Sequence, residues 1–113
     1  MQLPNWIEIR RAPAAIDPAL SYLDQGERSA ILLAQSEPDV LLLIDEAAGR
    51  LEASRRGIPN TGTLGVLRAA AIKRLVDLPA AISRLAATNF RVSRLLIDEL
   101  LADDAARMNP PPE

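Results

Sequence analysis

Val40-Leu41-Leu42-Leu43-Ile44-Asp45-Glu46 is the stretch that decides the fold, because five branched apolar residues end abruptly in two carboxylates. A strand that is apolar at every position must be covered on both faces, as in a parallel sheet that lies between helices. Ligands of such sheets bind beyond the carboxyl ends of the strands, which is where Asp45 and Glu46 stand. These two acids are therefore candidates for a functional site.

The segments around this strand predict an α/β fold class, with a parallel sheet flanked by helices. Before residues 40–44 we expect a short strand over residues 6–10 and a helix that begins after Asp17 or at Asp24 and ends before Pro38. After it we expect a helix over about residues 46–56 that ends at Gly57. An extended piece over residues 58–60 should lead into a helix that ends near Leu75. Two more helices should follow.

The last two helices are predicted to begin at Pro79 and Ser93, the first of them ending near Asn89. We expect one domain over residues 1–105 and a disordered, proline-rich tail over residues 106–113. The inner strand is so apolar that it needs partners on both edges, and its short neighbours barely provide them. The sheet should therefore lack a strand.

The composition excludes several kinds of chemistry. The 113 residues include no Cys and no His, which removes disulfides, zinc sites with thiolate or imidazole ligands, and Cys or Ser/His nucleophiles. Carboxylates are the strongest metal ligands left, so a bound cation should be Mg²⁺ or Mn²⁺. No apolar run reaches the roughly 20 residues that span a bilayer, and we expect a cytoplasmic protein that does not enter a membrane.

Charge is distributed unevenly along the chain, although its formal net value is only −2. Residues 24–46 carry six acids against one base, and residues 50–74 carry six bases against one acid. An acidic region beside a basic one suits a metal site that faces a polyanion, but solvated helix faces give the same pattern more often.

Glu27 and Asp45 each have two interpretations. Glu27 fits a capping box with Asp24, and it also lies on the apolar stripe of its helix, where a carboxylate would need a partner. Asp45 fits a helix N-cap, and it also ends the strand that follows the Glu27 helix. If the two carboxylates came within about 5 Å, their repulsion would cost roughly 3 kcal/mol, which a divalent cation would remove.

Three further residues are candidates for binding a phosphate or RNA. Thr61 and Thr63 lie in Thr61-Gly62-Thr63-Leu64-Gly65, which could offer hydroxyls and helix-start amides to a phosphate. Alternatively, the segment is only a capped helix start whose glycines allow close packing. The segment lacks the lysine ending of a P-loop, which disfavours nucleotide hydrolysis. Arg50 could meet a phosphate or remain solvated.

Three blocks in this order resemble the PIN-domain family, in particular its VapC-like subgroup. They are residues 23–31 (LDQGERSAI), residues 42–50 (LLIDEAAGR) and residues 57–67 (GIPNTGTLGVL). The resemblance implies a Mg²⁺- or Mn²⁺-dependent ribonuclease, often the toxin of a toxin-antitoxin pair. It implies that Glu27 and Asp45 are catalytic metal ligands, and that Asp24 and Glu46 are their nearest supports.

The resemblance covers only the C-terminal part of the family's pattern. Family members begin with a strand ending in aspartate and with helices that bring a further acid, and we expect this chain to lack them. It would then be a truncated protein with part of a metal site, inactive alone. Its expected partners are a second copy paired through the sheet edge, an antitoxin or a separate N-terminal fragment, and RNA. The rival hypotheses are a non-catalytic interaction module and an unrelated small α/β binding domain.

Overall fold

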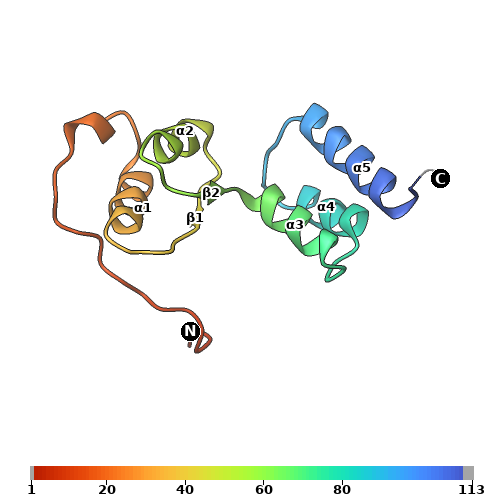
Figure 1. Ribbon diagram of the computed structural model, residues 1–113, viewed down its shortest axis with the longest axis horizontal. Helices are drawn as coiled ribbons and strands as arrows, with labels where there is room; N and C mark the ends of the chain where they lie inside the picture. The colour runs from red at the N-terminus through yellow and green to blue at the C-terminus, as the bar shows by residue number, and fades with distance from the viewer. Residues whose placement is uncertain (1, 111–113) are drawn as a thin grey trace. The chain divides into compact units, whose positions relative to one another are not determined.

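The computed structural model describes residues 2–110, which contain α-helices and a small parallel sheet (Figure 1). The elements in chain order are η1 (Pro18–Leu20), α1 (Gln25–Gln35), β1 (Leu42–Leu43), α2 (Ala47–Arg55), β2 (Asn60–Thr61), α3 (Thr63–Ile72), α4 (Leu78–Ala86) and α5 (Arg94–Met108). Leu42 lies opposite Asn60 and Leu43 opposite Thr61 in the parallel pair. The predicted α/β class and parallel strand pairing are confirmed.

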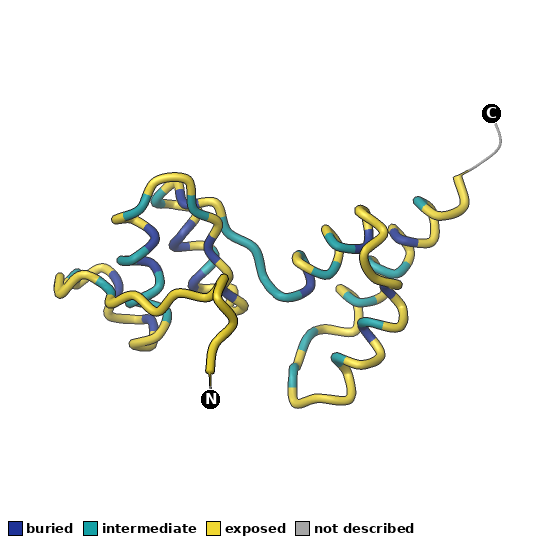
Figure 2. The backbone as a smooth tube through the Cα atoms, turned by 90° about the horizontal axis from the view of Figure 1, so that it is seen from below, coloured by how far each residue is buried: buried dark blue, intermediate teal, exposed yellow. Residues whose placement is uncertain are grey.

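The described chain divides into two compact units, one that ends at Gly62 and one that begins at Thr63. Each unit has buried residues of its own (Figure 2). The first core consists of Leu20, Leu23, Ile31, Ala34, Leu42, Ile44, Ala53 and Ile58. The second consists of Ala71, Leu78 and Ile82. The single domain expected over residues 1–105 stays a prediction.

The start of α1 positions the first predicted acid. The Asp24 side chain accepts a hydrogen bond from the Glu27 amide at 2.8 Å, and the Glu27 side chain accepts one from the Asp24 amide at 3.3 Å. This reciprocal pair satisfies two amides that the helix start would otherwise leave open. The helix then buries Ile31 and Ala34 against the first core.

The sheet is shorter than the apolar run predicts. Leu42 and Ile44 are buried in the core with α1 and α2, whereas Leu41 and Leu43 are 61% and 62% exposed. Alternate side chains of a strand point to opposite faces, so the helices of the first unit cover one face only. The expectation that both faces are covered is therefore wrong for the described residues.

Four predicted boundaries or elements need correction. Residues 6–10 form no strand, and Trp6 and Ile9 are more than three-quarters exposed. The N-cap of α2 is Glu46 rather than Asp45, and its side chain makes no capping bond. Helix α3 ends at Ile72, ahead of the predicted end near Leu75, and α4 ends at Ala86, ahead of Asn89.

Residues 106–108, which were predicted to belong to a disordered tail, are helical. Helix α5 continues to Met108, because its last turns are held by ion pairs from Arg107 to Asp103 and Asp104. Residues 111–113 of the tail prediction lie outside the described residues. Other local predictions are confirmed: Gly57 ends the α2 segment with φ +72°, and the Ser93 side chain caps α5. No helix in the described part of the chain is long and apolar enough to cross a membrane.

Candidate functional site

Glu27 combines both roles that its position in the sequence allows. Its Oε1 atom accepts from the Asp24 amide, which completes the capping box. Its Oε2 atom is buried and has no hydrogen-bond partner. A buried carboxylate oxygen without a partner costs free energy, so such an atom calls for an explanation.

The surroundings of Glu27 disfavour its negative charge. Burial raises the pKa of the Glu27 carboxyl, and the nearby negative charges of Asp24 and Glu46 raise it further, against a lowering by the hydrogen bond from the Asp24 amide. The charges of Asp24, at the start of α1, and Glu46, at the start of α2, therefore both act on the Glu27 carboxyl. A cation placed there would reverse the direction of the pKa shift.

Gly49 makes the close approach between Glu27 and the sheet possible. It is buried in α2, and a Cβ atom at this position would lie 3.0 Å from Glu27 Oε2 and 2.5 Å from Ile44 Cδ1. The second distance is shorter than side chains tolerate, so with any larger residue at this position the buried Ile44 side chain would have to shift. Glycine in a helix interior is unfavourable by about 1 kcal/mol, and here close packing explains it.

Asp45 stands at the same strand end, on the side of Gly62. A Cβ atom at Gly62 would lie 2.8 Å from Asp45 Oδ1, 3.4 Å from Arg50 Nη1 and 3.5 Å from the Ile44 carbonyl oxygen. Ile44 thus connects the two acids: its side chain lies beside Gly49 and Glu27, and its carbonyl lies beside Gly62 and Asp45. Both predicted ligands flank the carboxyl end of β1.

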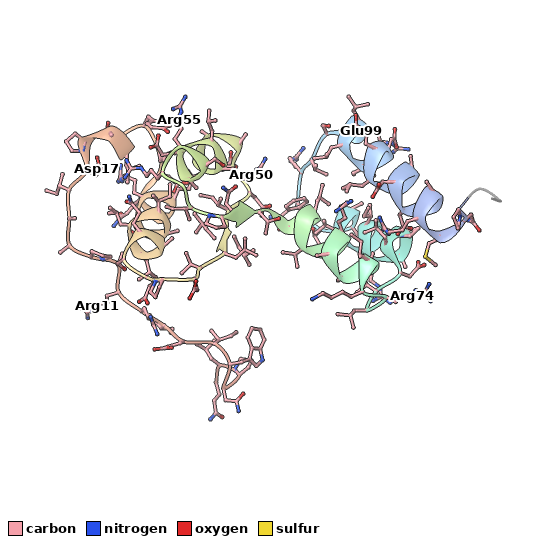
Figure 3. All side chains as sticks on the ribbon, viewed as in Figure 1. Arg11, Asp17, Arg50, Arg55, Arg74 and Glu99 are labelled. Atoms are coloured by element: carbon pink, nitrogen blue, oxygen red, sulfur yellow. The ribbon has the colours of Figure 1, made fainter. Side chains whose placement is uncertain are left out.

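Arg50 is held against this strand end. Its Nη1 atom donates to the Ile44 carbonyl at 3.3 Å and to the Asp45 carbonyl. Figure 3 shows Arg50 on the strand side of α2, with Arg55 at the other end of the helix. The two carbonyls use only part of the five-donor guanidinium group, and the remaining N–H groups can receive an anion.

The two threonines are placed differently. Thr61 lies on β2, where its hydroxyl donates to the Gly62 carbonyl at 3.5 Å. Thr63 is the first residue of α3 and belongs to the second unit. The structure therefore brings Asp24, Glu27, Asp45, Glu46 and Arg50 to one region of the first unit, with Thr61 on the neighbouring strand.

These residues fit a divalent cation only in part. The partnerless Oε2 atom of Glu27 and the glycine that gives it room are what a carboxylate ligand requires. Within residues 2–110, however, no three Asp or Glu side chains come together as a group that could hold a metal ion. The metal assignment to Glu27, Asp45, Asp24 and Glu46 stays a prediction.

Glu52 and its partners form a polar network that the sequence did not reveal. The Tyr22 hydroxyl donates to Glu52 Oε1 at 2.6 Å, and Arg56 Nε donates to Glu52 Oε2 at 2.8 Å. Arg56 Nη1 also donates to Asp17 at 2.8 Å and to Gln35 at 3.0 Å. The network ties η1 and α1 to α2, so Arg56 supports the fold rather than facing a phosphate.

The family of the chain follows from a comparison with known domains. A family model described as a PIN domain matches residues 2–105, which is nearly the whole chain. The chain belongs to the PIN-domain family. PIN domains are nuclease-type domains and in general depend on divalent metal ions. No curated protein and no solved structure gives a significant match to the chain.

Gly49 is the site residue that the residue-by-residue interpretation missed. The available signal was a glycine inside a predicted helix. It stands directly before Arg50 and four residues after Asp45, the acid that ends the strand. That signal indicates close approach of some group to the helix, but it does not say which group approaches.

Proposed function

We propose that this PIN-domain protein is a ribonuclease of the VapC-like, toxin-antitoxin type, with Mg²⁺ or Mn²⁺ held by Glu27 and Asp45. The observation that supports the proposal is the buried, partnerless Oε2 atom of Glu27, which the glycine at position 49 accommodates. A protein keeps such a destabilising atom where function needs it, and a carboxylate oxygen is a ligand that hard cations prefer. Asp24 and Glu46 add negative charge around that position.

Each remaining site residue has a role in this proposal. When bound, a divalent cation lowers the pKa of a water nucleophile and stabilises negative charge on the scissile phosphate. Arg50, held by two backbone carbonyls, would orient a phosphate with its remaining donors. The hydroxyl of Thr61 would provide a further contact to the RNA backbone.

The number of acids limits what this chain does alone. Octahedral Mg²⁺ needs six ligand positions, and nuclease sites of this chemistry recruit more acids than Glu27 and Asp45. Since no group of three acids exists among the described residues, we propose that a second polypeptide, such as a separate N-terminal fragment, supplies the missing ligands. An antitoxin would then act by blocking or filling the same region.

The test measures metal binding and RNA cleavage separately. Calorimetry with Mn²⁺ should detect weak binding to the chain, and both Glu27→Gln and Asp45→Asn should abolish it. Glu99→Gln is the matched control, because it removes one exposed carboxylate charge from α5 in the second unit. Manganese-dependent cleavage of RNA that is lost in both site variants would establish the enzyme.

An unchanged Mn²⁺ affinity in both site variants would contradict the proposed site. The second candidate function, a non-catalytic interaction module, is favoured by the absence of a three-acid group from the described residues. Under that hypothesis Mn²⁺ should have no effect on the stability of the chain.

A further inference from the structure

Gly62 stands where the parallel pair of strands ends. Strands β1 and β2 run in the same direction, and the Ile44 amide donates to the Thr61 carbonyl at 2.9 Å. The residues that follow this bond in the two chains, Asp45 and Gly62, therefore meet at the carboxyl end of the sheet. The pairing of the strands thus decides which residue lies beside the Asp45 carboxylate.

The backbone does not require glycine at position 62. Its φ lies outside the left-handed region, in contrast to the +72° at Gly57. Glycine gives the unfolded chain more conformational freedom than alanine does, so it is unfavourable where the backbone conformation does not need it. The reason for the glycine at position 62 therefore lies in the atoms around it.

A carboxylate oxygen occupies the space that a side chain at position 62 would take. A Cβ atom there would lie 2.8 Å from Asp45 Oδ1, a distance that Cβ atoms essentially never show. The next two atoms, Arg50 Nη1 at 3.4 Å and the Ile44 carbonyl oxygen at 3.5 Å, are at ordinary van der Waals distance. Of these three atoms, only the Asp45 oxygen would have to move.

Gly62 differs in this respect from Gly49. A Cβ atom at position 49 would lie 2.5 Å from Cδ1 of Ile44, a buried side chain of the core, so the core itself would be disturbed. At position 62 the blocking atom is the end of a side chain, which can rotate to another position without a change in the core. Gly62→Ala should therefore displace the Asp45 carboxylate and leave the fold intact.

We propose that Gly62 is a positioning residue of the metal site, because its missing side chain leaves the Asp45 carboxylate in place beside Arg50. The proposal rests on the proposed function, in which Asp45 is a metal ligand. Arg50 donates to the Asp45 carbonyl and holds the backbone of this acid, and Gly62 leaves room for its side chain. Helix α2 and the end of β2 together set the position of the ligand.

The first test is a double-mutant cycle in EDTA, which needs no bound metal. Thermal unfolding compares the effect of Gly62→Ala in wild type with its effect in Asp45→Ala, where the blocking carboxylate is absent. In the Asp45→Ala background, Gly62→Ala should raise the melting temperature, because it lowers the entropy of the unfolded chain. In wild type this rise should be absent or reversed. Equal shifts in the two backgrounds would overturn the proposal.

The second test measures Mn²⁺ binding to the chain by calorimetry. Gly62→Ala should weaken binding roughly tenfold to a hundredfold, which is the usual effect of disturbing a group that orients a metal ligand. Gly26→Ala is the matched control, because its Cβ would lie 3.5 Å from Asp24 Oδ1, at ordinary distance from another carboxylate of the first unit. Wild-type affinity in Gly62→Ala would overturn the proposal. A wild-type chain that binds no Mn²⁺ would instead contradict the proposed function, and the double-mutant cycle would still decide whether Gly62 sets the position of Asp45.

Discussion

Replacing Glu27 by glutamine should stabilise the metal-free protein. Glutamine has nearly the same shape, and its carbonyl oxygen can keep the capping bond from the Asp24 amide. It removes the charge of a carboxylate whose Oε2 atom is buried without a partner and whose neighbours Asp24 and Glu46 are also acidic. The amide nitrogen that replaces Oε2 is still a buried polar group, so the expected gain of about 1 kcal/mol in unfolding free energy comes from removal of the charge alone.

The pH dependence of this gain follows from the direction of the Glu27 shift. Burial, with help from Asp24 and Glu46, raises the folded-state pKa of the Glu27 carboxyl above its ordinary value of 4.5. Below the unfolded pKa the carboxyl is protonated in both states, and its charge has no effect on stability. As the pH rises through the folded pKa, wild type loses stability that the glutamine variant keeps. The advantage of the variant should therefore be present at pH 7 and absent near pH 4.

The assay is urea unfolding in EDTA at pH 7 and pH 4, followed by far-ultraviolet circular dichroism. Glu99→Gln, an exposed carboxylate on α5 (Figure 3), is the charge-matched control and should change the free energy by less than about 0.5 kcal/mol. Added Mn²⁺ should raise the free energy of unfolding of wild type and leave that of the glutamine variant unchanged. The reason is that an ion stabilises only a folded state that binds it. A variant less stable than wild type in EDTA at pH 7 would refute the reasoning.

Four further substitutions test the packing, a hydrogen bond and a backbone conformation of the first unit. Gly49→Ala should lower the free energy of unfolding by about 1–3 kcal/mol in urea, since its Cβ would overlap buried atoms. Gly26→Ala is the control: its Cβ meets only an ordinary contact at 3.5 Å, so this variant should be as stable as wild type or slightly more stable. Tyr22→Phe should lower the free energy of unfolding at neutral pH, because the Tyr22 hydroxyl donates a hydrogen bond to the Glu52 carboxylate. That hydrogen bond is the main cause of the lowered pKa of Glu52, so the cost should disappear as the pH falls through that pKa, which acid titration of the two proteins would show. Gly57→Ala should cost about 1 kcal/mol from backbone conformation alone, because φ is +72° and no atom lies within 4 Å of the added Cβ; an unchanged melting temperature would contradict this.

Local chemistry made several elements predictable from the sequence. The capping box of Asp24 and Glu27, the left-handed end at Gly57 and the Ser93 cap of α5 each depend on residues within a few positions of one another. The parallel pairing of residues 40–44 was also predictable, because their continuous apolar character differs from the alternation of a half-solvated hairpin. The same apolar run overstated the coverage of the sheet, since Leu41 and Leu43 remain exposed.

The predicted strand over residues 6–10 failed for a physical reason. Alternation of apolar and polar residues shows that a segment can form a strand, but a strand exists only when a neighbour supplies hydrogen-bond partners. The Asp45 cap prediction failed by one residue, because the chain enters α2 at Glu46. The sequence could not show that α2 approaches the strand end closely enough to require glycine at position 49, or that Glu52 would be buried with Tyr22 and Arg56.

The sequence by itself determined the α/β class and the carboxylate chemistry that remains without Cys and His. It also showed two acids, Glu27 at the start of a helix and Asp45 at the end of a strand. Only the tertiary structure decided that Ile44 connects Glu27 to Asp45, that Glu27 Oε2 is buried without a partner, and that Leu41 and Leu43 stay exposed. The physical reason is range: capping, turn and β-propensity terms act over a few residues, whereas burial and close approach depend on which distant segments pack together.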